Sequence, residues 1–136
     1  MDTNVFISAL SSKTGSNRQV LRACLEKRVS PVIGSALFHE MEDLMKRSAF
    51  LKRCPLSVDE QNKIFAAYLS SCEWVNIHFL WRPNLKDEAD NHLIELAIAG
   101  NAQVLITNNI KDLKSGELIF PSLKIVTPSK FLRQLL

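Results

Sequence analysis

Three acidic side chains stand out because each lies beside an apolar segment of the sequence. Asp2 immediately precedes the first apolar run, Glu40 borders the apolar stripe of a predicted helix, and Asp90 lies one turn before Leu93 and Ile94. Burying a carboxylate without a partner is costly, so an acid at the border of a core face is expected either to be paired or to belong to a site. An α/β fold that gathered the three acids at the ends of its strands would create an acidic active site.

Each acid also has a simpler interpretation. Asp87 and Asp90 open a predicted helix, where carboxylates stabilise the helix by complementing its dipole. Spacing alone leaves this structural role and a functional role open for both. Asp2, followed by Thr3 and Asn4, could simply be solvated near a terminus.

Hydrophobic periodicity predicts helices and strands that alternate along the chain. Helices are predicted over residues 17–27, 35–45, 57–72, 90–99 and 128–135, and strands over residues 4–10, 29–34, 74–79, 102–107 and 123–126. Ser57 and Glu60 have the spacing of a capping box, which gives the third helix a defined start. The alternation predicts a single α/β domain over residues 1–136, a three-layer α/β/α sandwich with a central, mainly parallel sheet. Ligands of such a sheet bind beyond the carboxyl ends of its strands.

Composition sets outer limits on the class of protein. The chain has 136 residues, 46% of them hydrophobic, and a formal net charge of +3, which permits a polyanionic partner without requiring one. No apolar run is long enough to cross a bilayer, and the N-terminus lacks a signal-peptide pattern, so we expect a cytoplasmic protein without membrane association. Cys24, Cys54 and Cys72 lack metal-ligand spacing and are predicted to be free thiols.

Other residue types could also serve a nucleic-acid or metal site. Isolated histidines are more often surface or structural residues than ligands, which applies to His39, His78 and His92. Basic side chains could guide an RNA backbone, although solvated helix faces explain each one equally well: Arg18, Arg22, Lys46, Arg47, Lys52, Arg53, Lys111 and Lys114. Trp74 and Trp81 could stack on bases, but core or interface anchoring is the more common use.

An ordered set of segments resembles the PIN domain. The set comprises Asp2–Leu10, Ser35 with Glu40, Asp87–Ala97, Leu105–Thr107 and Thr127–Leu132, and it covers essentially the whole chain. Within that family the chain looks most similar to VapC-like toxins of bacterial toxin–antitoxin systems. The resemblance implies a metal-dependent endoribonuclease with an RNA substrate, a cognate antitoxin protein as partner and a homodimeric assembly.

The resemblance also implies a catalytic metal site. Carried over by position, Asp2, Glu40 and Asp90 are the catalytic acids and the ligands of Mg²⁺ or Mn²⁺, with Asp87 and Asn109 as further candidate ligands. Hard cations of this kind prefer carboxylate and water oxygens. A bound ion would lower the pKa of a water molecule and neutralise charge at the scissile phosphate.

Three residues are implied as supports of that site. Thr3, Asn4 and Thr107 are candidates to orient the carboxylates or to bind a phosphate oxygen.

The sequence departs from the family pattern at two places. Asn109 stands where many members have a fourth acid, and Asp112 comes three positions later. The alternative function is therefore a degenerate, weakly active or inactive PIN module that binds RNA or a protein partner. Members also usually have apolar residues before the first acid, whereas Asp2 follows Met1 directly, as a truncated or mis-assigned start would explain. If Met1 is the true terminus, its ammonium group would compete with the cation.

A receiver-type or phosphatase domain is a third possibility, since it too places acids at strand ends. It requires an aspartate nucleophile or phosphoacceptor with a nearby lysine, and the sequence offers no convincing match.

Overall fold

The computed structural model describes residues 1–11, 15–47, 54–76, 88–108, 110 and 123–135, with the backbone alone for residues 88–91. Its helices are α1 (Thr3–Ser11), α2 (Ser16–Leu25), α3 (Ser35–Arg47), α5 (Val58–Ser71), α6 (Glu88–Ala99) and α8 (Pro128–Leu135). Its strands are β1 (Val32–Ile33), β2 (Glu73–Trp74), β3 (Val104–Ile106) and β4 (Lys124–Val126). None of the helices in these ranges is both long and apolar enough to cross a membrane.

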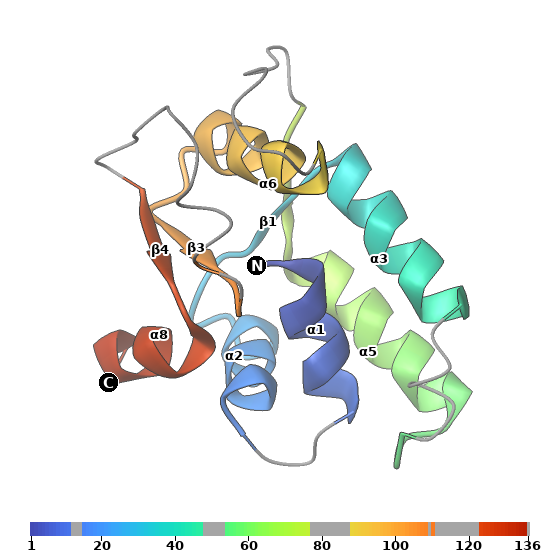
Figure 1. Cartoon of the computed structure of the whole chain (residues 1–136). Helices are drawn as coiled ribbons and strands as arrows, with labels where there is room; N and C mark the ends of the chain where they lie inside the picture. Colours follow the sequence, from blue (N-terminus) through green and yellow to red (C-terminus); the bar gives the residue numbers. More distant parts are fainter. Residues whose placement is uncertain (12–14, 48–53, 77–87, 109, 111–122, 136) are drawn as a thin grey trace.

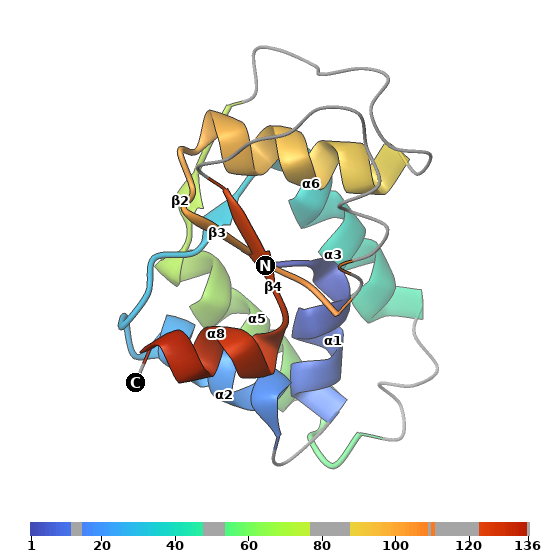
Figure 2. The same cartoon turned by 60° about the vertical axis from the view of Figure 1, so that its left-hand side comes forward.

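The helices lie on two sides of the strands. Helix α6 lies on one side, whereas α1, α2, α5 and α8 lie on the other, and this arrangement is the same in both views (Figures 1 and 2). Helix α3 follows β1 and packs against both α1 and α6. The strands are therefore enclosed by helices, as expected for an α/β protein.

The strands pair in parallel, but in two separate sheets within the described residues. Strand β1 pairs with β2, so that Val32 lies opposite Glu73, and β3 pairs with β4, so that Val104 lies opposite Lys124. The α/β class agrees with the sequence prediction. One continuous central sheet is not observed among these strands, so the three-layer sandwich stays a prediction.

The prediction of a strand over residues 4–10 is wrong, because this segment forms helix α1. Every apolar side chain of α1 is buried, so the apolar residues alone do not distinguish this helix from a buried strand. The helical period is visible only in the polar residues. Asn4, Ser8 and Ser11 recur at spacings of four and three, and all three are at least partly exposed.

The other predicted elements are present, most with shorter boundaries. Helix α5 begins with the predicted capping box: the Ser57 hydroxyl accepts the Glu60 N–H at 3.2 Å, and the Glu60 carboxylate accepts the Ser57 N–H at 3.2 Å. Of the strand predicted over residues 74–79, only Trp74 lies in β2; residues 75–76 are not part of a strand, and residues 77–79 lie outside the described part of the chain.

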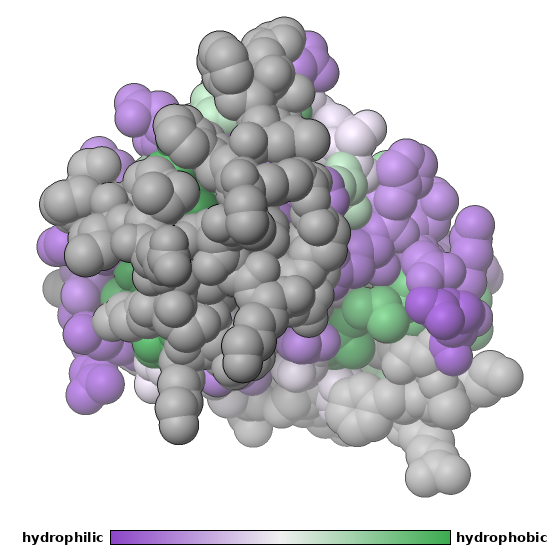
Figure 3. All heavy atoms as spheres, turned by 45° about the horizontal axis from the view of Figure 1, so that its top comes forward, coloured by the Kyte–Doolittle hydropathy of each residue, from purple (hydrophilic) through white to green (hydrophobic). Residues whose placement is uncertain are grey.

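Two groups of buried side chains form the core. The larger one joins α1, α3, α5 and α6 and includes Phe6, Leu10, Met41, Tyr68 and Ile94. The smaller one lies between α2, β3, β4 and α8. On the face shown in Figure 3, the described surface is largely hydrophilic with small hydrophobic areas between, as amphipathic helices with inward apolar faces require.

Candidate functional site

Two of the predicted site residues, Asp2 and Thr107, are in direct contact. The Thr107 hydroxyl donates a hydrogen bond of 2.7 Å to Oδ2 of Asp2. Thr107 is fully buried and directly follows β3, and its own N–H donates to the Val126 carbonyl of β4 at 3.0 Å. The β3–β4 pair therefore fixes the threonine, and the threonine orients the carboxylate.

The backbone of Asp2 joins the strand layer to helix α1. Its N–H donates to the carbonyl of Ile106 in β3 at 2.9 Å, and its carbonyl accepts the N–H groups of Val5 at 3.1 Å and Phe6 at 3.4 Å. The carboxylate thus lies where β3 ends and α1 begins. This is the carboxyl end of a parallel strand, the position at which α/β proteins bind ligands.

The two polar residues after Asp2 differ in their surroundings. The Thr3 side chain is fully buried, and its hydroxyl has no hydrogen-bond partner among the described residues. A buried hydroxyl without a partner is costly and points to a missing ligand or water. Asn4 is exposed, so it can contact solvent or a substrate.

Glu40 and Asp90 lie in α3 and α6, two helices that pack against each other. Glu40 lies in α3 and is half-buried, and α3 packs against α1, which follows Asp2, and against α6, which contains Asp90. The Asp90 side chain, Asp87 and Asn109 fall outside the described part of the chain. Within that part, no three acidic, histidine or cysteine side chains form a cluster that could hold a metal ion. The geometry thus brings Asp2 and Thr107 together and leaves the complete ligand set a prediction.

The amino group of Met1 is the nearest charged group in sequence to Asp2. Burial lowers its pKa below the ordinary value of 8.0, although the Asp2 carboxylate opposes this by favouring the charged form. The group is therefore neutral over a wider pH range than a solvated amine.

Sequence reasoning missed one buried acid. Glu95 is 1% exposed, and its Oε2 lies 3.6 Å from Nδ1 of His92, one turn earlier on α6. A charged residue within the apolar run Leu93–Ala97 is the signal that could have identified it. His92 thus contacts a carboxylate of its own helix.

The remaining candidates have structural surroundings. His39 is exposed, and its ring centroid lies 5.4 Å from that of Phe38. The Trp74 ring also packs on Phe38, with 5.5 Å between the ring centroids. His78 and Trp81 lie outside the described residues. The cysteines are free, as predicted.

The donor chemistry fits a hard divalent cation. Asp2 has a carboxylate that one hydrogen bond holds in place, and the unpartnered Thr3 hydroxyl lies next to it in the chain. The further predicted donor, Glu40, is also a carboxylate. Oxygen ligands of this type suit Mg²⁺ or Mn²⁺ rather than a thiolate-binding metal.

Comparison with known proteins identifies the family. The family model described as PIN domain matches residues 1–111, which is most of the chain. No curated protein and no solved structure matched the chain. Because the match spans α1 through β3 and includes Asp2, Glu40, Asp90 and Thr107, the chain belongs to the PIN domain family.

Proposed function

We propose that this protein is a divalent-metal-dependent endoribonuclease that hydrolyses RNA phosphodiester bonds, with Asp2, Glu40 and Asp90 as metal ligands and catalytic acids. Membership in the PIN domain family supports a nuclease, because PIN domains are typically nucleases and generally use divalent metals. The observation that carries the proposal to particular residues is the hydrogen bond from Thr107 to Asp2. It holds a carboxylate in one orientation at the carboxyl end of β3.

The residues of the chain have separable roles in this proposal. The hydrogen bond engages Oδ2 of Asp2, so Oδ1 can ligate a cation while Thr107 keeps the carboxylate from rotating. Glu40 and Asp90 supply the other carboxylates, with Asp87 or Asn109 as additional oxygen donors. When bound, Mg²⁺ or Mn²⁺ would supply a water of lowered pKa and positive charge against the scissile phosphate. Asn4 is exposed beside Asp2 and is placed to contact a phosphate oxygen.

The test is cleavage of single-stranded and structured RNA by the purified chain with Mn²⁺, Mg²⁺ or EDTA. Cleavage should require the cation and should be lost in Asp90→Asn. Asp43→Asn is the matched control, because Asp43 lies in α3, is exposed and pairs with Arg47 on the helix surface. Robust cleavage in EDTA, or full activity in Asp90→Asn, would contradict the mechanism.

The alternative is a degenerate PIN module that binds RNA or a protein partner without cutting. Asn109 in place of an acid favours it, since an amide oxygen can ligate a cation but brings no charge. Titration with Mn²⁺ separates the two functions. A catalytic site should bind Mn²⁺ saturably and raise the unfolding free energy by about 2.7 kcal/mol at a hundred times the dissociation constant, whereas an empty site should do neither.

We also propose that the protein is the toxin of a toxin–antitoxin pair and forms a homodimer. This follows the resemblance to VapC-like toxins. Expression without a partner should arrest growth of a bacterial host, and the arrest should disappear in Asp90→Asn. Light scattering should give twice the mass of the 15.4 kDa chain, whereas a monomer mass would exclude the dimer.

A further inference from the structure

Basic and acidic residues are segregated within the described chain. Residues 15–30, which include α2, and residues 123–135, which include β4 and α8, contain one acidic residue, Glu26. The basic residues of these two segments are Arg18, Arg22, Lys27, Arg28, Lys124, Lys130 and Arg133. In the remaining described residues, acidic side chains outnumber basic ones and lie mainly in α3, α5 and α6. Positive charge is therefore concentrated on α2, β4 and α8, although the formal net charge of the whole chain is only +3.

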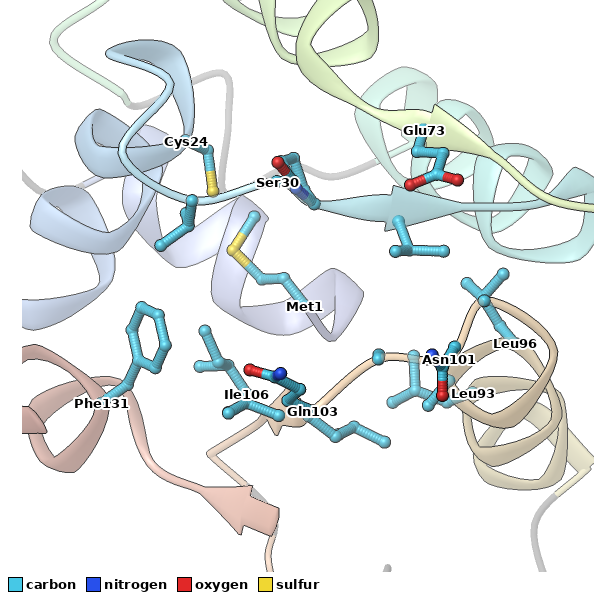
Figure 4. A pocket seen from close by; sticks show the side chains of 18 residues that line it. Met1, Cys24, Ser30, Glu73, Leu93, Leu96, Asn101, Gln103, Ile106 and Phe131 are labelled. Carbon is cyan, nitrogen blue, oxygen red and sulfur yellow. The ribbon is translucent and has the colours of Figure 1, made fainter. Parts of the chain in front are cut away.

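Helices α2 and α8 lie side by side, with basic side chains on their outer surfaces. The two helices are in contact, as both views show (Figures 1 and 2). Phe131 marks the inner side of α8, because it is buried and lines an apolar cavity of about 420 Å³ together with Ile106 of β3 (Figure 4). Lys130 and Arg133 are three positions apart on α8 and exposed, and Arg22 is exposed on α2. Arg22, Lys130 and Arg133 together form the α2–α8 face.

The cations of the α2–α8 face are not neutralised by neighbouring acids. On α3, by contrast, Lys46 lies 3.8 Å from the carboxylate of Glu42, and Arg47 pairs with Asp43. No such ion pair joins a cation of the α2–α8 face to another residue that the structure describes, and even Glu26, one helical turn after Arg22, forms none. The positive charge of this face is thus available to an anionic partner.

The α2–α8 face begins beside the proposed catalytic site. The Asn108 side chain, which directly follows Thr107, donates a hydrogen bond of 3.2 Å to Oδ1 of Asn17 in the first turn of α2. Helix α8 begins at Pro128, two residues after Val126, whose carbonyl accepts the N–H of Thr107 at 3.0 Å. The arginine of each helix comes five residues after Asn17 or Pro128, a rise of about 7.5 Å along the helix axis. Both helices therefore start at the corner that Thr107 occupies and carry their cations away from it.

We propose that the α2–α8 face binds the sugar–phosphate backbone of a single-stranded RNA and leads the strand to the carboxylate of Asp2. The inference rests on the proposed function for its substrate class, RNA, but contacts with phosphates require no cleavage. Lysine and arginine bind such a backbone by neutralising phosphates and releasing counterions, largely without regard to base sequence. The carboxylates of the site repel phosphates, and a cationic face beside them offsets this repulsion.

Two observations favour RNA over an anionic membrane as the occupant. A helix that binds a membrane surface inserts its apolar side among the lipids. The apolar side of α8 is already buried, since Pro128 and Phe131 are enclosed and Phe131 belongs to the smaller core group. The face also borders the catalytic corner, so a strand bound there can reach Asp2 without leaving the surface of α2 and α8.

The test compares two triple variants that remove equal charge from different helices. The first replaces the α2–α8 face: Arg22→Gln, Lys130→Gln and Arg133→Gln. The control replaces exposed cations of α3 and α5: Lys46→Gln, Arg47→Gln and Lys63→Gln. Arg18 stays in both, because its Nε donates to the Ala9 carbonyl at 2.7 Å and holds α2 against α1. Since the two variants have the same net charge, a difference between them reports the location of the charge.

Binding of a fluorescent oligouridylate is measured in EDTA, which prevents metal-dependent cleavage, between about 50 and 200 mM KCl. Loss of three phosphate contacts should reduce the slope of log association constant against log salt by about 2, because each contact on a single strand contributes roughly 0.7. The α2–α8 variant should bind about 10–100-fold more weakly than the unmodified chain, and the control variant should keep nearly the original affinity and slope. Arg22→Lys with Arg133→Lys retains the charge and should retain the slope.

Four outcomes of the binding experiment would overturn the proposal. They are absence of RNA binding by the unmodified chain at about 50 mM KCl, equal losses in the two triple variants, unchanged RNA affinity in the α2–α8 variant, and loss of binding to phosphatidylserine vesicles in that variant while RNA binding is retained. The last outcome would assign the face to a membrane.

Cleavage with Mn²⁺ separates this proposal from the nuclease function. RNA binding that depends on the α2–α8 face, without any cleavage, would support the face and contradict the nuclease. Mn²⁺-dependent cleavage with an unchanged KM in the α2–α8 variant would support the nuclease and contradict the face.

Discussion

The hydroxyl of Thr107 reaches the carboxylate of Asp2 at 2.7 Å, although 105 positions separate the two residues in the chain. A buried threonine at the end of a paired strand has little freedom, since β4 holds its backbone and the core encloses its side chain. Asp2 receives its orientation from this contact. Thr107 is therefore a positioning residue for the proposed metal site.

Replacing Thr107 by valine should weaken metal binding. Thr107→Val keeps the shape of the side chain but removes the donor to Asp2, so Mn²⁺ affinity should fall by about 10–100-fold. The free energy of unfolding without metal should fall by about 1 kcal/mol. Calorimetric titration with Mn²⁺ and urea unfolding measure the two effects. Thr107→Ser restores the hydroxyl and should recover most of the affinity, whereas equal losses in the valine and serine variants would assign Thr107 a packing role alone.

Stability should fall in alkaline solution because two thiols and a phenol are buried. Burial raises the pKa of Cys24 and of Cys72 from 9.0 to about 11, and burial also raises the pKa of Tyr68. Above pH 9 the unfolded chain loses thiol protons that the folded chain retains, so ionisation favours unfolding. The free energy of unfolding should be insensitive to the two thiols below pH 9 and should decline from pH 9 to pH 11.

The matched comparison for this decline is Cys24→Ala, because Cys24 is the more deeply buried thiol. Urea unfolding at pH 8, 9, 10 and 11 should show a shallower alkaline decline in the variant. An unchanged slope would mean that the Cys24 thiol does not titrate between the two states.

Gly100 marks a close approach of α6 to strand β1. A Cβ at this position would lie 2.6 Å from Cγ1 of Val32 and 3.3 Å from Cγ2 of Val75. Both neighbours are β-branched and have few rotamers with which to retreat. Gly100→Ala should therefore destabilise the protein by about 1–3 kcal/mol, measured by urea unfolding.

A double-mutant cycle with Val32→Ala tests the cause. Val32→Ala removes the atom that would clash, so Gly100→Ala should cost clearly less in that background. Strictly additive effects would show that the glycine is required for another reason.

The sequence predicted the order and class of most elements because their local signals agree with the tertiary structure. The capping box of Ser57 and Glu60 starts α5, and Pro128 starts α8 as predicted. Helix α1 was missed because its apolar residues form a nearly continuous run, so the helical period is visible only in the spacing of Asn4, Ser8 and Ser11. The separation of the strands into two sheets could not be predicted, since it depends on which edges meet in space.

The sequence was sufficient to name candidate site residues, but it could not predict which of them contact one another. Asp2, Thr107 and Glu40 could be named from their positions beside apolar segments and from the family resemblance. The specific pairing of Thr107 with Asp2 required the structure, because no local rule relates residues at opposite ends of a domain. Glu95 was not identified from the sequence, although it is a charged residue within the apolar run Leu93–Ala97, and its side chain is buried.

The Asp2–Thr107 pair also has a consequence for biosynthesis. Asp2 leaves the ribosome first, but its partner is added 105 positions later, and β4, which anchors that partner, later still. At about 5–20 residues per second, roughly 5–20 seconds of translation separate the two residues. A chain released before β3 lacks Thr107, and one released before β4 lacks the strand that holds it. Only a translation product that extends through β4 can form the Asp2–Thr107 hydrogen bond in its final setting.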